Sequence, residues 1–550
     1  MPDAPKYIAV NTSSFLLSSM SRFVSALARP TAAAAGIVTG VWCGIEYSWR
    51  FQMTDRNAPH VNSKCDLAGL GATAYTMRPL KEPCRVRSAL ASDSCEDVYD
   101  AIIVGGGYAG LHCALSLAEK NKRVLLLEGK RIGCGASGRN GGDGIIGFQL
   151  PVDLMAKWTG SDETAKTLYS HSEMGYHRLK EIIHRYNIKC DAHEHGALTV
   201  AFRPPQDRME ESNSQQRQAI EDATVTALRQ DSAAAASKFG EKLVVMSAKD
   251  IHDSGFVSPR FGHGFLEPRN LELNPLELAL GLARACESTG KVTIHECSPV
   301  ESITRSAAGD TWVVVTSLGA KCYGRNVVLA TSYAPFKLSP WLSLKTVPLS
   351  TSMMLTTPIP DAKLDAVFTA KFAVFDERFA LSYFRRYDGN RILFGALASA
   401  LPFRNLGGKV GCCTPDPGMP AGTNNLQQNS VEKRLFDDFY ATFPSLKDDN
   451  EPIRAERIWQ GRLSAALPLF PLVGRQRNGL YYSLGYCGHG IVPTCAAGEL
   501  LAAAIADGDN RFELWSTVPT SLPLGGPWGY AGSAALSQLQ YVADQLAGRV

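Results

Sequence analysis

The sequence has little of what several large classes of protein require. Its 56 basic residues exceed its 53 acidic residues by only three, whereas a protein that neutralises many nucleic-acid phosphates needs a clear basic surplus. Its 14 cysteines include no C-x-x-C pair, so their spacing indicates neither a tetrahedral zinc site nor a dithiol redox motif. The composition, 45% hydrophobic and 20% charged over 550 residues, is typical of a folded chain with one large or two medium globular units. We therefore expect no nucleic acid partner.

Long apolar runs are missing from the amino-terminal region. Its longest charge-free apolar run, Ala32–Ile45, falls short of the roughly 18 residues that a membrane-spanning helix needs, so we expect no firm membrane association. Residues 1–54 contain four basic and two acidic side chains and a cluster of serines. This bias is typical of a mitochondrial transit peptide, but a disordered extension of a cytoplasmic protein explains it equally well. Residues 55–97 show no sustained period and are interpreted as a connector.

A glycine-rich turn follows the first buried strand that the sequence predicts. The apolar run Ala101–Val104, typical of a central parallel strand, leads directly into the segment GGGYAG at 105–110. In such a turn Gly105 allows the tight bend, Gly107 lets the backbone approach a diphosphate, and Gly110 lets the following helix pack closely. The helix then presents unpaired N–H groups and the positive end of its dipole to the diphosphate.

The next predicted strand ends in a carboxylate. Apolar residues recur at helical spacing over 111–118, and the strand Val124–Leu127 is followed by Glu128. A carboxylate at this position accepts hydrogen bonds from the ribose hydroxyls of an adenosine. Strand, glycine turn, helix, strand and carboxylate within one short unit predict a Rossmann-like dinucleotide-binding domain.

A second glycine-dense segment, RIGCGASGRNGG at 131–142, follows, and a nicotinamide-binding fold has no need of it. Together with GGGYAGL at 105–111 and Glu128, it makes the sequence resemble the D-amino-acid oxidase and glycine oxidase superfamily, most closely its gamma-glutamylputrescine oxidoreductase branch. The resemblance extends from about Tyr75 to about Tyr530. It implies an α/β fold in which an FAD-binding Rossmann-like (GR2-type) domain is interleaved with an α+β substrate domain that has a mostly antiparallel sheet.

The resemblance also implies how the chain is divided. The FAD-binding domain takes residues 98–150, 265–342 and 456–515; the substrate domain takes 151–264 and 343–455; a tail with an amphipathic helix at 536–546 takes 516–550. Several elements are predicted within these limits: a helix from Pro275 to Cys286, one strand over Val292–Val300, a helix over 494–506, and a hairpin around Tyr387–Asn390. Residues 205–240 and 405–430 are expected to be surface insertions.

The family's FAD contacts can be carried over onto matching positions of this chain. They comprise the Rossmann turn and its carboxylate, the second glycine segment, and two distant segments that cross the cofactor. The residues are Gly105, Gly107, Tyr108, Ala109, Gly110, Glu128, Gly129, Lys130, Gly135, Ala136, Ser137, Arg139, Asn140, Gly141, Val300, Thr331, Gly485, Gly488, His489, Gly490 and Ile491. The resemblance puts Val300 at the adenine and the 485–491 loop at the pyrimidine end of the isoalloxazine, where N–H groups and a helix dipole stabilise negative charge on reduction.

The chemistry that the resemblance implies is oxidation of an amine. A neutral amine passes hydride from its alpha carbon to flavin N5, water hydrolyses the resulting imine, and oxygen or another acceptor reoxidises the flavin. Tyr383 and Arg385 alternate on one predicted strand with Phe384 facing the other way, so we predict that both orient a small-molecule amine substrate. Cross-strand packing and a solvent-exposed salt bridge are the alternatives for these two residues.

One departure from the family pattern bears on the substrate. Amino-acid oxidases place an arginine two residues after the equivalent of Gly461 to clamp the substrate carboxylate, but this chain has Leu463 there and Arg462 one place earlier. Neighbouring residues of an extended segment point opposite ways, so Arg462 is a poor substitute. This favours an amine without a carboxylate beside the reacting carbon. No cysteine occurs in 461–474, so we expect noncovalent FAD.

Other readings remain open from the sequence. An oxidase or dehydrogenase of N-methyl amino acids uses the same chemistry, and a noncatalytic flavin-binding protein would retain the same motifs. A flavin domain that serves RNA modification is disfavoured by the near-neutral charge. His193 and His195 share one face of a predicted strand, but no third ligand is evident, so no metal site is expected.

Overall fold

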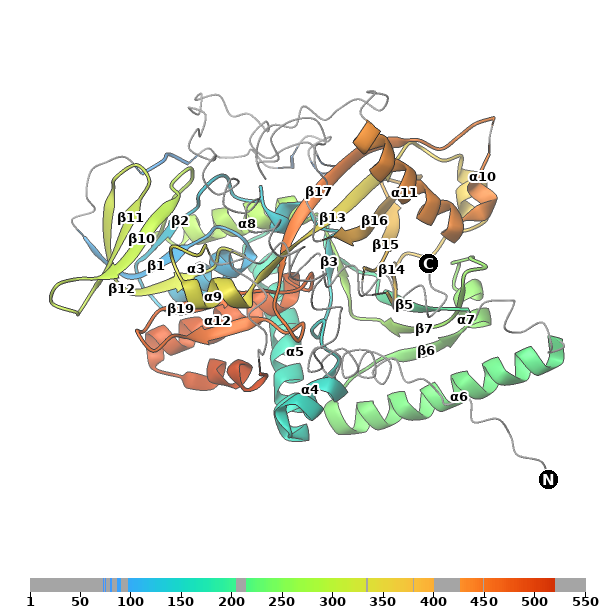
Figure 1. Ribbon diagram of the computed structural model, residues 1–550, viewed down its shortest axis with the longest axis horizontal. Helices are drawn as coiled ribbons and strands as arrows, with labels where there is room; N and C mark the ends of the chain where they lie inside the picture. The colour runs from blue at the N-terminus through green and yellow to red at the C-terminus, as the bar shows by residue number, and fades with distance from the viewer. Residues whose placement is uncertain are drawn as a thin grey trace, which may run out of the picture.

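The computed structural model describes most of the chain between residues 97 and 519. The described residues are 73, 75, 80–81, 87–90, 97–203, 214–332, 335–378, 380–399, 426–448 and 450–519. They form two eight-stranded sheets and one three-stranded sheet, and Figure 1 shows the two large sheets next to each other. The predicted transit peptide at 1–54 and the predicted helix at 536–546 lie outside the described residues.

The first sheet is built around parallel strands. Its centre is β1 (Val98–Val104), which lies between β12 (Lys321–Leu329) and β2 (Val124–Leu127) and runs parallel to both. The other strands are β9 (Val292–His295), parallel to β2; β10 (Val300–Arg305) and β11 (Trp312–Thr316), antiparallel additions beside β12; β19 (Tyr481–Leu484), parallel to β12; and β18 (Leu472–Arg475), antiparallel to β19.

Burial on both faces explains the uninterrupted apolar sequence of β1. Ala101 and Ile103 belong to the core beneath three helices, whereas Ile102 and Val104 belong to a separate core on the opposite face. The helices are α3 (Tyr108–Glu119), α8 (Pro275–Ser288) and α12 (Ile491–Asp507). The strand, turn, helix and strand that the sequence predicts between 101 and 128 are therefore confirmed, as is the helix that begins at Pro275.

The strand predicted over Val292–Val300 is wrong as a single element. The chain forms β9 up to His295, turns through Cys297, whose φ is +53°, and resumes as β10 at Val300. The two pieces have different neighbours: β9 extends the parallel sheet beside β2, and β10 joins an antiparallel hairpin with β11. The apolar spacing of the segment gave no sign of this change of direction.

The second sheet is antiparallel at all but one of its pairings. In order, its strands are β17 (Ala455–Ala465), β13 (Val347–Thr356), β16 (Arg391–Ser399), β15 (Tyr383–Tyr387), β14 (Ala373–Asp376), β5 (Ala197–Phe202), β7 (Phe261–Glu267) and β6 (Val244–Ser247), with only β14 and β5 parallel. The predicted hairpin between β15 and β16 is present, and the left-handed backbone of Asp388 and Gly389 fits its tight turn.

The sheets divide the chain differently from the predicted limits at two places. β7 and β17 both belong to the second sheet, although residues from 265 and from 456 were assigned to the first domain. Both strands pair with neighbours from the substrate domain, β7 with β5 and β17 with β13. The second sheet thus ends nearer residue 268 and residue 466. The predicted insertion at 205–240 contains the 26-residue helix α6 (Ser214–Phe239), which runs along one edge of the molecule in Figure 1.

A short sheet and six further α-helices also belong to the described part of the chain. The sheet consists of β3 (Asp143–Gly144), β8 (Leu271–Glu272) and β4 (His193–Glu194). The helices are α4 (Val152–Thr159), α5 (Asp162–Arg185), α7 (Ala248–Asp253), α9 (Pro340–Lys345), α10 (Asp361–Asp365) and α11 (Leu426–Thr442). Among the described residues, no helix combines the length and apolarity needed to cross a membrane.

His112, on the buried face of α3, leads to a stability prediction. Both of its ring nitrogens lack a hydrogen-bond partner, and burial lowers its pKa to about 3. Replacing it with leucine, His112→Leu, removes an unsatisfied polar group and is expected to increase the free energy of unfolding by about 1–2 kcal/mol.

The effect of His112→Leu should depend on pH in a defined direction. Between pH 6.5 and 3 the unfolded wild-type histidine takes up a proton that the folded one refuses, so the wild type loses stability as the pH falls. The advantage of the leucine variant should therefore grow over this range. Chemical denaturation at several pH values measures it, with the exposed His252→Leu as control; a destabilised His112→Leu would contradict the prediction.

Candidate functional site

The turn between β1 and α3 can be formed only by glycine at two of its positions. Gly105 has φ of +112°, and a Cβ there would lie 2.4 Å from the carbonyl oxygen of Ala330. A Cβ on Gly110 would lie 1.9 Å from the carbonyl oxygen of Gly105, because the helix rests directly on the turn. A Cβ on Gly107 would meet only the Ser137 hydroxyl, at 3.1 Å. The first two glycines thus serve the fold, and Gly107 leaves space in front of the helix.

The start of α3 is suited to an anion. Gly107 is its N-cap and offers no side-chain acceptor, and the first turn contains no acidic residue. The backbone N–H of Tyr108 donates to Ser137 Oγ at 3.0 Å, while the Tyr108 hydroxyl donates to the Pro275 carbonyl at 2.7 Å and ties α3 to α8. The next N–H groups, at Ala109 and Gly110, have no intrahelical acceptor in an α-helix. They form a donor set for phosphate oxygens.

Glu128 and the chain around Val300 form the second corner of the site. The Glu128 carboxylate accepts hydrogen bonds from the N–H groups of Gly106 at 2.7 Å and Lys130 at 2.8 Å. Its backbone carbonyl accepts from the Ser298 N–H at 2.8 Å, and a Cβ on Gly129 would lie 3.5 Å from Pro299. Glu128, Gly129, Lys130 and Val300, predicted from separate segments, therefore lie next to one another.

The turn at Gly105 and the loop at Gly485 lie at the same edge of the first sheet. β12 separates β1 from β19, and all three strands are parallel, so the segments that follow them lie at neighbouring positions. Thr331 comes just after β12, with its Cα 3.2 Å from the position of a Gly105 Cβ. The Gly485 N–H donates to the Ser332 carbonyl at 3.2 Å. The structure thus brings three predicted cofactor segments together.

The loop before α12 has an irregular backbone that glycine permits. Gly485 and Gly488 have φ of +70° and +89°, and Gly490 is the N-cap of α12 without a side-chain acceptor. His489 donates its backbone N–H to the Tyr486 carbonyl at 2.9 Å, and burial lowers the pKa of its imidazole to about 4. The side chain is therefore neutral at physiological pH, and the loop offers N–H groups rather than a charged histidine.

The segment from Gly135 to Gly142 bridges the two large sheets. Its 3-10 turn, Ala136–Gly138, is followed by Arg139, whose carbonyl accepts from Trp459 Nε1 at 3.0 Å and whose Nη1 donates to the Gln460 carbonyl at 3.2 Å. The Asn140 side chain closes the loop by donating to the Ala136 carbonyl at 3.0 Å and accepting from the Gly142 N–H at 2.8 Å. The loop is thereby held against β17.

Tyr383 and Arg385 share one face of β15, as their spacing predicts. Phe384 points the other way and packs against Phe256 in the core of the second sheet. Tyr383 lies beside the glycine loop, 3.2 Å from the position of a Gly141 Cβ, and its hydroxyl is 3.4 Å from Thr351 Oγ1. Burial raises the pKa of Tyr383 to about 12, so its hydroxyl keeps its proton.

The Arg385 side chain makes its polar contacts with other residues of the protein. It is 4% exposed, forms an ion pair with Glu272, and donates to the carbonyls of Gly141 at 3.0 Å and Leu273 at 3.3 Å. These contacts fasten the glycine loop to β15 and β8. Its contacts therefore favour a positioning role over the predicted direct contact with the substrate.

Sequence reasoning missed two acidic residues at this place. Glu272 pairs with Arg385, and Asp143, which follows the glycine loop directly, lies opposite Glu272 in the three-stranded sheet. The adjacency of Asp143 to the loop was a usable signal. The pairing of Glu272 with Arg385 was not, because the two lie 113 positions apart and nothing local marks either as a partner.

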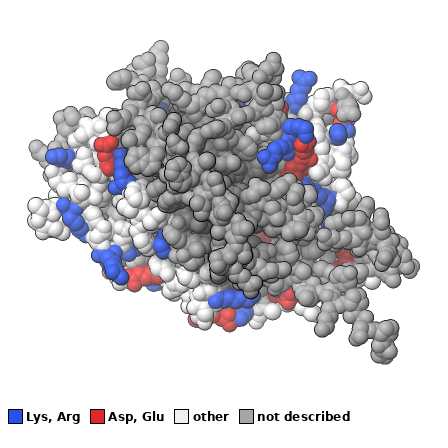
Figure 2. Space-filling view, viewed as in Figure 1, with Lys and Arg blue, Asp and Glu red and all other residues white. Residues whose placement is uncertain are grey.

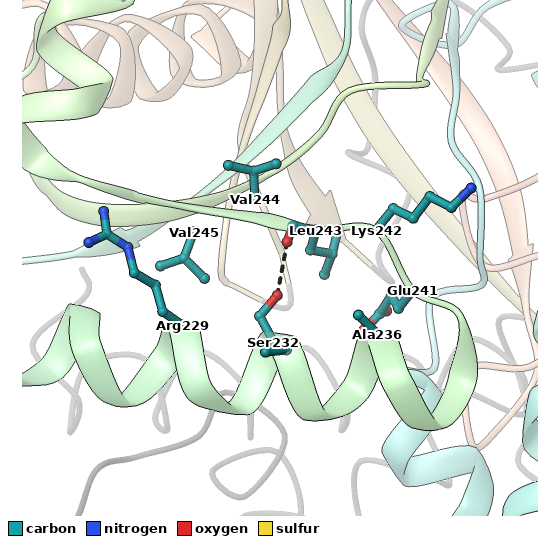
Figure 3. Close-up of a pocket in the computed structure, with 9 residues that line it drawn as sticks. Arg229, Ser232, Ala236, Glu241, Lys242, Leu243, Val244 and Val245 are labelled. Atoms are coloured by element: carbon teal, nitrogen blue, oxygen red, sulfur yellow. Dashed lines mark hydrogen bonds between the residues drawn. The ribbon is translucent and has the colours of Figure 1, made fainter.

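Two other features lie apart from this arrangement. A surface groove of about 350 Å³ lies between α6 and β6, where the Ser232 hydroxyl donates to the Leu243 carbonyl at 2.9 Å (Figure 3). Its lining comes only from residues 229–245.

His193 and His195 stack with ring centroids 5.2 Å apart, and within the described ranges no three His, Cys, Asp or Glu side chains are grouped to hold a metal ion. On the face shown in Figure 2, basic and acidic side chains of the described residues are interspersed.

Comparison with known proteins identifies the family. The sequence profile described as FAD dependent oxidoreductase, the DAO family, matches residues 100–504. The chain belongs to the DAO family. Gamma-glutamylputrescine oxidoreductase of Escherichia coli K12 is 29% identical over 421 residues, which cover 76% of this chain and 86% of that protein.

Solved structures of two oxidoreductases share the fold. Glycine oxidase from Bacillus cereus has a TM-score of 0.54 at 19% identity, with 76% of this chain and 98% of that chain covered. L-proline dehydrogenase from P. horikoshii has a TM-score of 0.54 at 16% identity, covering 77% and 96%. The predicted architecture, a Rossmann-like domain interleaved with a domain that has a mostly antiparallel sheet, is confirmed.

The described residues fit FAD. The start of α3 supplies N–H donors without a competing acid, Gly107 leaves room for a diphosphate, and the Glu128 carboxylate, held beside this turn by the Gly106 N–H, is the acceptor that ribose hydroxyls need. The loop at 485–490 and the start of α12 supply further N–H groups at the same edge. The protein is therefore an FAD-dependent amine or amino-acid oxidoreductase of the DAO family.

Proposed function

We propose that the enzyme oxidises the carbon–nitrogen bond of an amine that has no carboxylate beside the reacting carbon, with a polyamine derivative such as gamma-glutamylputrescine as substrate. The observation that carries the proposal is Leu463 at the position where amino-acid oxidases place their carboxylate-binding arginine. Leu463 lies in β17 opposite Leu349, and Arg462 lies opposite Ser350 on the other face of the strand. The name of the Escherichia coli relative points to the same substrate class.

FAD, when bound, supplies the acceptor for the hydride from the substrate carbon. The protein's own contribution is placement. Trp459 and Arg139 lock the glycine loop against β17, and Arg385 locks its far end against β8. The Tyr383 hydroxyl remains a neutral donor or acceptor beside the loop. A substrate amine held there is oriented by fixed groups, as amine oxidation requires.

Cys487, in the loop at 485–490, supports the expectation that FAD is bound noncovalently. Cys487 donates its thiol to the carbonyls of Gly485 at 3.1 Å and Ala466 at 3.4 Å, and burial raises its pKa to about 12. Attachment through sulfur needs a thiolate, which this environment disfavours. The electron acceptor, oxygen or another oxidant, and the mitochondrial location stay predictions.

Anaerobic titration of the purified full chain tests the proposal. Gamma-glutamylputrescine is expected to bleach the visible absorption of the bound flavin completely, whereas glycine and D-amino acids should not at the same concentration. Sarcosine and dimethylglycine represent the N-methyl amino acid alternative. Reduction by these compounds alone would transfer the function to that class, and a flavin that no amine bleaches would favour a noncatalytic protein.

A further inference from the structure

A narrow pocket between the glycine loop and the second sheet contains an unpaired acid. Its lining comes from Gly141, Asp143, Met353, Tyr383, Phe384, Arg385 and Leu393. The Asp143 Oδ1 atom is shielded from solvent and has no hydrogen-bond partner. A shielded oxygen without a partner costs free energy, and because this one lines a pocket it can be satisfied by a ligand that enters there.

The charges around Asp143 leave it without a cation of its own. Arg385 is the basic group that faces it, but Arg385 already pairs with Glu272 and donates to two backbone carbonyls. Arg385 is thus shared between two acids, and the other basic side chain at this place, His195, lies 3.5 Å from Glu272. Burial raises the pKa of Asp143 to about 7, with Arg385 opposing the rise and Glu272 adding to it; the other titratable groups close by, the phenols of Tyr75 and Tyr383, stay protonated.

The position of Asp143 is close to the segments that hold the flavin. It lies two residues after Gly141, and a Cβ on Gly141 would meet Asp143 Oδ2 at 2.6 Å. The next residue, Gly144, has its Cβ position 3.5 Å from a side-chain carbon of Ile491, the first residue of α12. Asp143 therefore lies between the glycine loop and the start of α12.

We propose that the Asp143 carboxylate binds the positively charged nitrogen of the amine substrate and accepts its proton, an inference that rests on the proposed function. The proton passes from the ammonium nitrogen to Oδ1, which leaves a neutral amine and a carboxylic acid, and no electrons move. A neutral amine is the form that can lose hydride. The pocket has about 140 Å³ of free space but no room for a whole water molecule. Binding of the amine therefore requires a lining side chain to move, and Met353 is the unbranched, adaptable one.

The role explains why this site would prefer cations. Amino-acid oxidases use a positive arginine to bind a negative carboxylate, whereas this chain has Leu463 at that position and an acid, Asp143, in the pocket. A zwitterionic amino acid would bring its carboxylate towards Asp143, beside an arginine that already pairs with Glu272. An amine whose nearest charge is its own nitrogen meets no such repulsion.

The variant Asp143→Asn keeps the shape of the side chain and removes its charge. Full-length wild type and variant, both loaded with FAD, are titrated anaerobically with gamma-glutamylputrescine from pH 5 to pH 8. In the wild type the apparent affinity should rise as the pH rises through about 7, where Asp143 ionises. In the variant it should be nearly independent of pH, about 100-fold weaker than in the wild type at pH 8 and similar to the wild type at pH 5. Asp310→Asn, an exposed carboxylate of the β10–β11 turn, is the control.

A second readout does not need catalysis. In the protein without substrate, the raised pKa of Asp143 makes a stabilising contribution that is complete below pH 3.8 and is lost as the pH rises through about 7. Asp143→Asn should therefore unfold at a higher temperature than the wild type at pH 8 and at about the same temperature at pH 4. Asp143→Ser also lacks the charge but has a smaller side chain, and it should show the same dependence of the unfolding temperature on pH. It serves as a second variant in case asparagine disturbs the loop.

The outcomes separate this inference from the proposed function. If gamma-glutamylputrescine reduces wild type and Asp143→Asn with equal affinity, the role of Asp143 is overturned and the proposed function stands. If no amine reduces the wild type but the amine perturbs its flavin spectrum, and not that of the variant, the proposed function fails and the binding role of Asp143 stands. If no amine reduces the flavin or changes its spectrum, both are overturned.

Discussion

Gly107→Val is expected to yield a folded protein that cannot retain FAD. The backbone at Gly107, with φ of −79° and ψ of −177°, is extended and available to valine. A Cβ there meets only the Ser137 hydroxyl at 3.1 Å, and that side chain can turn away. The branched carbons would then occupy the space in front of the helix start, where the diphosphate approaches. We expect FAD binding to weaken at least 100-fold, about 2.7 kcal/mol.

Flavin content after purification and affinity for added FAD measure this effect, and circular dichroism checks the fold. Gly262→Val is a matched control, because Gly262 lies in β7 and the nearest atom to its Cβ position is a side-chain carbon of Arg203 at 3.4 Å. Gly110→Ala should differ from both: its Cβ would lie 1.9 Å from a backbone oxygen, so the chain should fail to fold. A Gly107→Val protein with its full complement of FAD would contradict the assignment of the turn.

The elements that the sequence predicted well are those with a local cause. The turn at 105–110 and the hairpin at 387–390 need particular backbone angles, and Gly105, Asp388 and Gly389 are residue types that adopt them. The helix that begins at Pro275 has its N-cap, Asn274, immediately before it, and Asn274 Oδ1 accepts two backbone N–H groups. Such features can be predicted because sequence neighbours produce them.

The features that escaped prediction depend on residues far apart in the chain. The sequence assigned β17 to the third segment of the FAD domain, but β17 pairs with the ten-residue strand β13 and so belongs to the second sheet. The sequence predicted that Arg385 contacts the substrate, but its N–H groups bind the Glu272 carboxylate and the carbonyls of Gly141 and Leu273. Asp143 could be singled out only from the structure, which shows that its Oδ1 atom is buried without a hydrogen-bond partner. These roles depend on burial and on contacts between residues far apart in the sequence. The alternation of side chains along a single strand cannot predict such contacts.

Arg385→Met should be the most destabilising single change at the loop end of the site. It leaves the Glu272 carboxylate, 16% exposed, with only the His195 imidazole at 3.5 Å and beside a second acid, and it frees the carbonyls of Gly141 and Leu273. Removing one partner of a buried ion pair costs about 3–5 kcal/mol. The loss should be greatest above pH 7, where Asp143 also becomes charged. The adjacent Arg386→Met is the control, because Arg386 likewise combines an ion pair, with half-exposed Asp365, and donations to the carbonyls of Phe368 and Gly389, but nearer the surface, so its loss should cost less.

The double variant Arg385→Met/Glu272→Gln separates a positioning role from direct substrate binding. If Arg385 acts by neutralising Glu272 and holding the loop, removing both charges should recover most of the lost free energy of unfolding and much of the FAD affinity. If Arg385 instead contacts the substrate, the single variant should unfold like the wild type and show only a raised KM, which the second substitution would not repair. Denaturant titration with steady-state kinetics on all three proteins distinguishes the two. The ion pair with Glu272 leads us to expect the first result.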